Sequence, residues 1–241
     1  MHPKHLYGKK GRVISWSARL KDALRQINSK YVIILLDDFF LKSPVRSDVI
    51  EKCIAFMEQN DDAVAFKFFT DPGLGAVVCD EFVSADPDFC FCVSAMATLW
   101  RKEFLIELLR DENPWDFEFY ASARWRNKYR KTYKMYVQNT GKPVFDYIYY
   151  TPKGGWSAIL RGKWLITVPE FFEQYGLEVD YEKRGFIDPS FETQSIHQAN
   201  GLRNDLVDMI RHPTRIVHYT QCAGRIIYLQ LKRLKSKYFN P

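Results

Sequence analysis

Two adjacent carboxylates, Asp37 and Asp38, follow the apolar segment 31–36. In open α/β sheets, ligands bind beyond the carboxyl ends of the strands, so acidic residues after a buried strand occupy the place of a site. Neighbouring carboxylates repel each other, and a divalent cation offsets that repulsion. Mg²⁺ and Mn²⁺ bind one or two carboxylates together with phosphate oxygens and water, which suits a nucleoside diphosphate. The alternative is that one Asp caps the following turn while the other is solvated.

A second acidic group lies in the sequence Asn113-Pro114-Trp115-Asp116-Phe117-Glu118. Asp116 and Glu118 stand near an expected helix start, with aromatic rings beside them. This setting suits a general base that accepts a proton from a reacting hydroxyl. The alternative is that both carboxylates only complement the dipole of the first helical turn.

An alternation of helices and strands must position these residues. Residues 17–28 have the apolar spacing of an amphipathic helix, and 31–36 are apolar on both faces, as is typical of a central parallel strand covered by helices. Asp48 and Glu51 form an acidic capping pattern before a second helix, and 63–69 are a further strand that ends at Asp71. The sequence therefore predicts an α/β domain with an at least partly parallel sheet.

The later segments have weaker patterns. We expect a helix at 98–110, an acidic turn and basic, aromatic helix at 114–130, a tyrosine-rich strand at 143–150 and a loop at 153–156. Helical spacing returns at 202–211 and in the tail.

The chain has 241 residues, enough for one large domain or two small ones. No apolar run approaches the roughly 20 residues that cross a bilayer, and the first residues do not form the apolar stretch of a signal peptide. An intracellular protein is therefore expected. Of the five cysteines, only Cys90 and Cys92 are close in sequence, and this spacing is a weak metal signal; reduced, buried thiols are the alternative.

The net charge of +6 belongs to the C-terminal tail. After Asp208 there is no acidic residue, and seven Lys and Arg side chains follow. The segment 225–237 combines basic residues with an apolar stripe, so it can lie on an anionic membrane surface or dock on its own domain. The rest of the chain is near neutral, which disfavours a nuclease, and no nucleic-acid partner is expected.

Five short motifs resemble, in order, bacterial GT-A-type glycosyltransferases of polysaccharide biosynthesis. They are Trp16-x-x-Arg19-Leu20, the segment 31–41, Trp100-Arg101-Lys102, the segment 114–118, and Arg161-Gly162-Lys163-Trp164. The resemblance covers roughly residues 16–164. It departs from the family at its start, because GT-A enzymes usually begin with a strand, a helix and a strand, and only about fifteen residues precede Trp16.

The resemblance implies roles for these residues. Asp37 and Asp38 match the acidic motif that meets the nucleotide's ribose and diphosphate, with Asp38 the stronger candidate for the metal ligand. Asp116 and Glu118 match the segment that supplies the base in inverting members. Lys163 and Trp164 match a loop near the donor site. A histidine sometimes completes the metal site, but His197, His212 and His218 match no motif, and structural or solvated imidazoles are the alternative.

We therefore expect a GT-A-like, Rossmann-like domain at 1–200, with a mixed sheet flanked by helices and without the usual first strands. A helical, basic C-terminal segment at 201–241 would pack on it or on a membrane. The expected activity is transfer of a sugar from a nucleotide-sugar donor to a glycan or lipid-linked acceptor, assisted by Mn²⁺ or Mg²⁺. The expected place is the cytoplasm, with a peripheral position at the inner face of the membrane as an alternative. The alternative is a non-catalytic relative that binds a partner, membrane or polyanion through its tail.

Overall fold

The computed structural model describes residues 14–89, 91–147, 158–160 and 162–187. Several expectations fall on segments outside these ranges: the loop at 153–156, the helix at 202–211, the tail at 225–237, Cys90, Cys222 and the three histidines. The chain divides into two units, one of residues 1–36 and 45–145 and the other of residues 37–44 and 146–241. The expected boundary after residue 200 lies outside the described residues.

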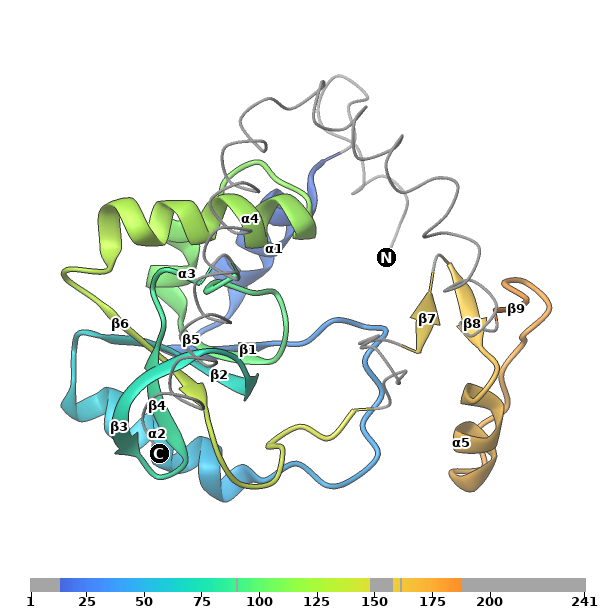
Figure 1. Ribbon diagram of the computed structural model, residues 1–241. Helices are drawn as coiled ribbons and strands as arrows, with labels where there is room; N and C mark the ends of the chain where they lie inside the picture. Colours follow the sequence, from blue (N-terminus) through green and yellow to red (C-terminus); the bar gives the residue numbers. More distant parts are fainter. Residues whose placement is uncertain (1–13, 90, 148–157, 161, 188–241) are drawn as a thin grey trace, which may run out of the picture. The chain divides into compact units, whose positions relative to one another are not determined.

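A mixed six-stranded sheet forms the centre of the first unit (Figure 1). Its strands are β1 (Tyr31–Ile34), β2 (Ala63–Thr70), β3 (Gly73–Cys79), β4 (Phe82–Ala85), β5 (Thr98–Arg101) and β6 (Lys134–Gln138), in the order β1-β5-β2-β6-β4-β3. Strands β2 and β6 are parallel, and the other neighbouring pairs are antiparallel. The expected α/β class with a partly parallel sheet is confirmed.

Helices cover both faces of this sheet. They are α1 (Trp16–Gln26), α2 (Ser47–Gln59), α3 (Lys102–Leu108) and α4 (Pro114–Arg124), which continues into a π-helical turn, η2 (Trp125–Tyr129). Figure 1 shows α1, α3 and α4 over one face and α2 over the other. Under the three helices, Leu24, Trp100, Leu105 and Phe117 belong to one buried cluster. On the other face, the Phe56 ring of α2 lies 5.8 Å from the Phe66 ring of β2.

The first described helix and strand, α1 and β1, form where the sequence predicts them. Ser15 caps α1 by accepting a hydrogen bond from the Ala18 amide, and the helix buries Leu24. Strand β1 forms as predicted but is shorter, and its expected central, parallel place is wrong. Within the described residues it is an edge strand, paired only with β5 and antiparallel to it. An apolar pattern on both faces indicates cover above and below a strand, and carries no information about its edges.

Three further predictions are corrected. Residues 98–101 of the predicted helix form β5, because they pair between β1 and β2, and only α3 is helical. Helix α2 has no side-chain cap, and Asp48 lies in its first turn. The predicted strand at 143–150 has, over 143–147, only an isolated bridge between Tyr147 and Leu41. Local propensity did not predict which segments form strands here, because strand pairing depends on residues that are distant in the sequence.

The second unit contains a small sheet and a helix. The sheet has the strand order β7-β8-β9, with β7 at Ile159–Leu160, β8 at Lys163–Leu165 and β9 at Phe186–Ile187. The helix α5 (Val168–Gln174) lies between β8 and β9 in the sequence. Trp164, Leu165, Val168 and Phe172 are buried together, and Phe40 packs against them. None of these elements was predicted from the sequence. Lys163 and Trp164, expected in a loop, lie on β8, and strands of two or three residues show no readable period.

A charged network joins α2 to the turn between β3 and β4. The Arg46 guanidinium donates to both carboxylate oxygens of Glu81, at 3.0 and 2.7 Å. The Gln138 side chain also donates to Glu81, at 2.7 Å. Gly141 has a φ of 82°, and a Cβ there would overlap the Glu81 carboxylate. Glu81 thus holds α2, β6 and the following loop at one point.

The core assignment predicts a difference between two leucines. Leu105 is 0% exposed under α3, whereas Leu74 on β3 is 45% exposed. Leu105→Ala should lower the free energy of unfolding by about 2–5 kcal/mol, because it leaves a cavity. Leu74→Ala serves as the matched control and should change it by less than about 0.5 kcal/mol. Urea unfolding followed by circular dichroism measures both, and equal losses would contradict the assignment.

The Glu81 network predicts a pH dependence of stability. The Arg46 guanidinium holds the pKa of the Glu81 carboxyl below its usual range, with Gln138 contributing. A lowered folded-state pKa adds stability above the ordinary Glu pKa of about 4.3, and this is lost as pH falls through the folded-state value. Wild type should therefore exceed Glu81→Gln in urea midpoint at neutral pH, and the two should converge in acid. The exposed Glu51→Gln variant is the control, and a constant gap for Glu81→Gln at all pH values would refute the linkage.

Candidate functional site

The acidic pair lies in a turn that follows β1. Leu35 and Leu36 separate the end of the strand from Asp37 and Asp38, so the pair stands two residues beyond its predicted place. Asp37 is exposed and Asp38 is half-buried. The backbone oxygen of Asp38 accepts a hydrogen bond from the Ala158 amide, at 2.8 Å. The pair therefore belongs to the second unit, and its backbone is tied to the residue before β7.

The same backbone hydrogen bonds extend to Lys163 and Trp164, the other residues predicted to bind the sugar donor. The Ala158 oxygen accepts a hydrogen bond from the Leu165 amide of β8, at 3.0 Å. Lys163 and Trp164 lie on the same strand and, as neighbours, point to opposite sides. Backbone hydrogen bonds through Ala158 therefore connect the acidic turn to the strand that contains Lys163 and Trp164.

Lys163 and Trp164 differ in what they offer to a ligand. Lys163 is exposed, so its ammonium group is accessible from solvent. The Trp164 ring is 8% exposed and packs 6.2 Å from the Phe40 ring and 5.9 Å from the Phe172 ring. Its indole Nε1 has no hydrogen-bond partner in the described structure. In this conformation Trp164 is a core residue, and Lys163 alone presents a polar group outward.

Asp116 takes part in the cap of α4. Asn113 is the N-cap residue, and its side-chain oxygen accepts from the Asp116 amide at 2.9 Å. The Asn113 amide group also donates to the Asp116 carboxylate, at 2.6 Å. The first of these bonds satisfies one amide at the helix end, and Asp116 lies in the first turn of α4.

Glu118 is held by one carboxylate oxygen. Its Oε1 accepts from the Ser94 hydroxyl at 2.6 Å and from the Ala95 amide at 2.8 Å. Its Oε2 makes no hydrogen bond or ion pair within the described part of the chain, and the side chain is half-buried. Two donors thus fix the orientation of the carboxylate, and the second oxygen remains available to accept a proton.

Trp115 is a residue that the site prediction missed. Its side chain is 77% exposed, and it stands three residues before Glu118 on α4, so the two lie on one face of the helix. An exposed indole offers a large apolar ring face for packing against a ligand. The signal was in the sequence, in the motif that contains Glu118, but exposure could not be read from it.

A buried lysine also escaped the sequence analysis. Lys67 on β2 is 1% exposed, and its ammonium forms an ion pair with Asp71. It donates to the Phe91 backbone oxygen at 3.2 Å and lies 4.8 Å from the centre of the Phe69 ring. Burial raises the pKa of the Asp71 carboxyl, and the Lys67 charge opposes that shift. A single cation inside an apolar strand was the available signal.

Lys67 and Glu118 bind opposite ends of one loop. Lys67 holds Phe91, and Glu118 holds Ser94 and Ala95. Between them, the Ser122 hydroxyl accepts from the Val93 amide at 3.0 Å. The loop that orients Glu118 is therefore anchored both to the central strand of the sheet and to α4.

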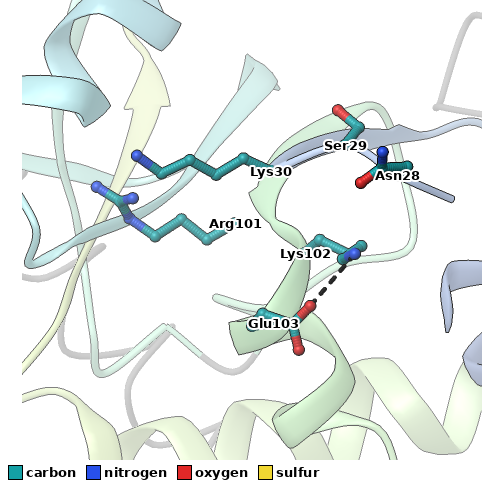
Figure 2. Close-up of a pocket in the computed structure, with 6 residues that line it drawn as sticks. All are labelled: Asn28, Ser29, Lys30, Arg101, Lys102 and Glu103. Carbon is teal, nitrogen blue, oxygen red and sulfur yellow. Dashed lines mark ion pairs between the residues drawn. The ribbon is translucent and has the colours of Figure 1, made fainter.

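A pocket of about 370 Å³ lies at the start of β1 (Figure 2). Figure 2 shows three cationic side chains in its lining, Lys30, Arg101 and Lys102. Each of them has a partner within the protein. Lys30 forms an ion pair with Glu58 at 2.6 Å, and Lys102 forms one with Glu103 at 3.3 Å. The Arg101 guanidinium donates hydrogen bonds to backbone oxygens. Because these cations already have partners within the protein, the pocket is a weaker candidate than the residues around Glu118.

The predicted residues thus form two groups, one in each unit. Asp37, Asp38, Lys163 and Trp164 belong to the second unit, and Asp116 and Glu118 to the first. Within the described ranges, no group of three or more His, Cys, Asp or Glu side chains could hold a metal ion. Across the same residues, every helix is too short or too polar to cross a membrane.

Comparisons with protein-family models, with curated proteins and with solved structures found no match to this chain. The assignment of function therefore depends on the residues described above.

The geometry of Glu118 predicts a difference between two substitutions. Glu118→Gln keeps an oxygen that can accept from Ser94 and Ala95, so the loop should stay in place. Glu118→Ala leaves both donors without this partner, which costs about 1–3 kcal/mol. Hydrogen exchange of the Ala95 amide should accelerate in the Ala variant and change little in the Gln variant. Equal protection in both would show that Glu118 does not hold the loop.

Proposed function

We propose that this protein is a glycosyltransferase that uses a nucleotide-sugar donor and Glu118 as its general base. The observation that carries the proposal is the carboxylate of Glu118, held through Oε1 by two donors with Oε2 left open. A base must be oriented and must keep a free lone pair, and this residue does both. Asp116, the other candidate, is engaged in the cap of α4.

The acceptor would bind at α4. Glu118 Oε2 would take the proton of the acceptor hydroxyl, and the exposed Trp115 ring would stack on the acceptor sugar. Removal of the proton makes the hydroxyl oxygen a stronger nucleophile toward the sugar carbon. The acceptor would be a glycan or a lipid-linked glycan, in the cytoplasm or at the inner face of the membrane.

The donor would bind at the acidic turn. Asp37 and Asp38 would supply carboxylate oxygens to a hard cation that takes few protein ligands. When bound, Mn²⁺ or Mg²⁺ would neutralise charge on the diphosphate leaving group. The exposed Lys163, joined to the same neighbourhood through β8, would face a phosphate.

Nucleotide binding tests the donor half of the proposal. Titration of the protein with UDP or dTDP in the presence of Mn²⁺ should give a saturable heat signal that Asp38→Asn abolishes. Asp61→Asn removes a fully exposed carboxylate elsewhere and should leave the signal unchanged. Absence of heat with every nucleoside diphosphate would exclude the donor site and favour the non-catalytic alternative.

Turnover tests the acceptor half. Release of nucleoside diphosphate from nucleotide sugars, with water as the acceptor, should fall by about 10²–10⁴-fold in Glu118→Gln, because general-base assistance is lost. Nucleotide binding should be unchanged in this variant. Full activity of Glu118→Gln would show that another residue is the base, even if the donor site is correct.

A further inference from the structure

Helix α2 is fastened to the β3–β4 turn by three successive side-chain contacts. Arg46 pairs with Glu81 at 2.7 Å, and Lys52 pairs with Asp80 at 3.0 Å. Next to this second pair, the Cys53 and Cys79 side chains interact with each other. From one pair to the next, the residue number rises along α2 and falls along the β3–β4 turn, so the helix and the turn run antiparallel along this contact.

Both cysteines lie at well-defined places in regular secondary structure. Cys53 lies in the middle of α2 and is 0% exposed. Cys79 is the last residue of β3 and pairs with Phe82 across a two-residue turn. Asp80 in that turn has a φ of 48°, which sets the hairpin tightly. Cys79 is half-buried, so a small oxidant in solution can reach it.

The remaining described cysteine has a different environment. Cys92 is 1% exposed within the cluster under α1, α3 and α4. Its sulfur lies 3.9 Å from the Ser122 backbone oxygen. Cys53 belongs to α2, which covers the other face of the sheet (Figure 1). Cys92 is therefore a buried thiol apart from the Cys53–Cys79 pair, and it can serve as a control.

We propose that Cys53 and Cys79 are a modification site, at which a low-molecular-weight disulfide converts the thiol pair into an intramolecular disulfide. The Cys79 thiolate attacks one sulfur of the reagent, forming a mixed disulfide and releasing one reagent thiolate. The Cys53 thiolate then attacks the Cys79 sulfur, closing the protein disulfide and releasing the second reagent thiolate. The two protons from the protein thiols go to the two released thiolates, so one disulfide is reduced and one is formed.

The surroundings determine the rate of this exchange. Burial raises the pKa of both thiols, and Asp80 adds to the shift at Cys79. Only the thiolate attacks a disulfide, so the pair reacts slowly at neutral pH and faster as pH rises. Lys52 lies beside the pair and favours the thiolate of Cys79. The pair therefore resists brief exposure to disulfides and responds to sustained exposure.

The product would join α2 covalently to the edge of the sheet. A disulfide restricts the unfolded chain by closing the loop between the two cysteines, so the folded state gains stability. The hairpin and the helix would then separate only after reduction, while the proposed base on α4, on the other face, would be untouched.

The test treats the full chain with oxidised glutathione at about pH 7 and about pH 8.5, where the thiolate fraction differs. Peptide mapping without reductant should recover a Cys53–Cys79 cross-linked peptide, formed faster at the higher pH. The product should have a higher Tm that returns to its original value with dithiothreitol. Cys53→Ser should stop at glutathione bound to Cys79, and Cys92→Ser should form the same cross-link as wild type.

Three results would overturn the proposal. One is glutathione retained on Cys79 in wild type without closure to Cys53. Another is a cross-link that joins other cysteines. The third is no reaction of the folded chain at either pH, under conditions in which the urea-unfolded chain is oxidised.

Discussion

The ion pair between Lys67 and Asp71 is the contact on which the candidate site depends. Strand β2 is buried on both faces along its first six residues, so an ammonium group within it must find compensation inside the protein. Asp71 supplies the opposite charge, and the Phe91 backbone supplies a hydrogen-bond acceptor. The buried cation thus connects the turn after β2, at Asp71, with the loop between β4 and β5, at Phe91.

The same loop connects this ion pair to the proposed base. Its far end donates two hydrogen bonds to one oxygen of Glu118, which orients the carboxylate without consuming it. Asp116, two residues earlier, instead completes the cap of its own helix. The same short motif therefore contains one carboxylate that stabilises a helix end and one that is placed to accept a proton. The difference arises from contacts with residues far away in the sequence.

Much of the fold could be predicted from local patterns. Apolar spacing predicted α1 and α2, and the apolar segments predicted β1 and β2, because these elements bury faces with a clear period. The helix α4 was expected within 114–130 on a weaker pattern. Pattern did not predict that Thr98–Arg101 pairs between β1 and β2, nor that β1 lies at an edge of the described sheet. Strand order and pairing depend on residues distant in sequence, and hydrophobic periodicity reports only which faces are covered.

For the site, residue type and spacing determined the candidates: an acidic pair after a strand, a carboxylate-rich helix start, and a Lys-Trp motif. Tertiary structure decided which of their atoms are available. It buried the Trp164 ring, left Lys163 outward, and joined the strand of both to the backbone of Asp38. It also revealed Lys67, whose role no local pattern contains. The physical reason is that exposure and hydrogen bonding are set by what packs against a side chain, and those neighbours come from other parts of the chain.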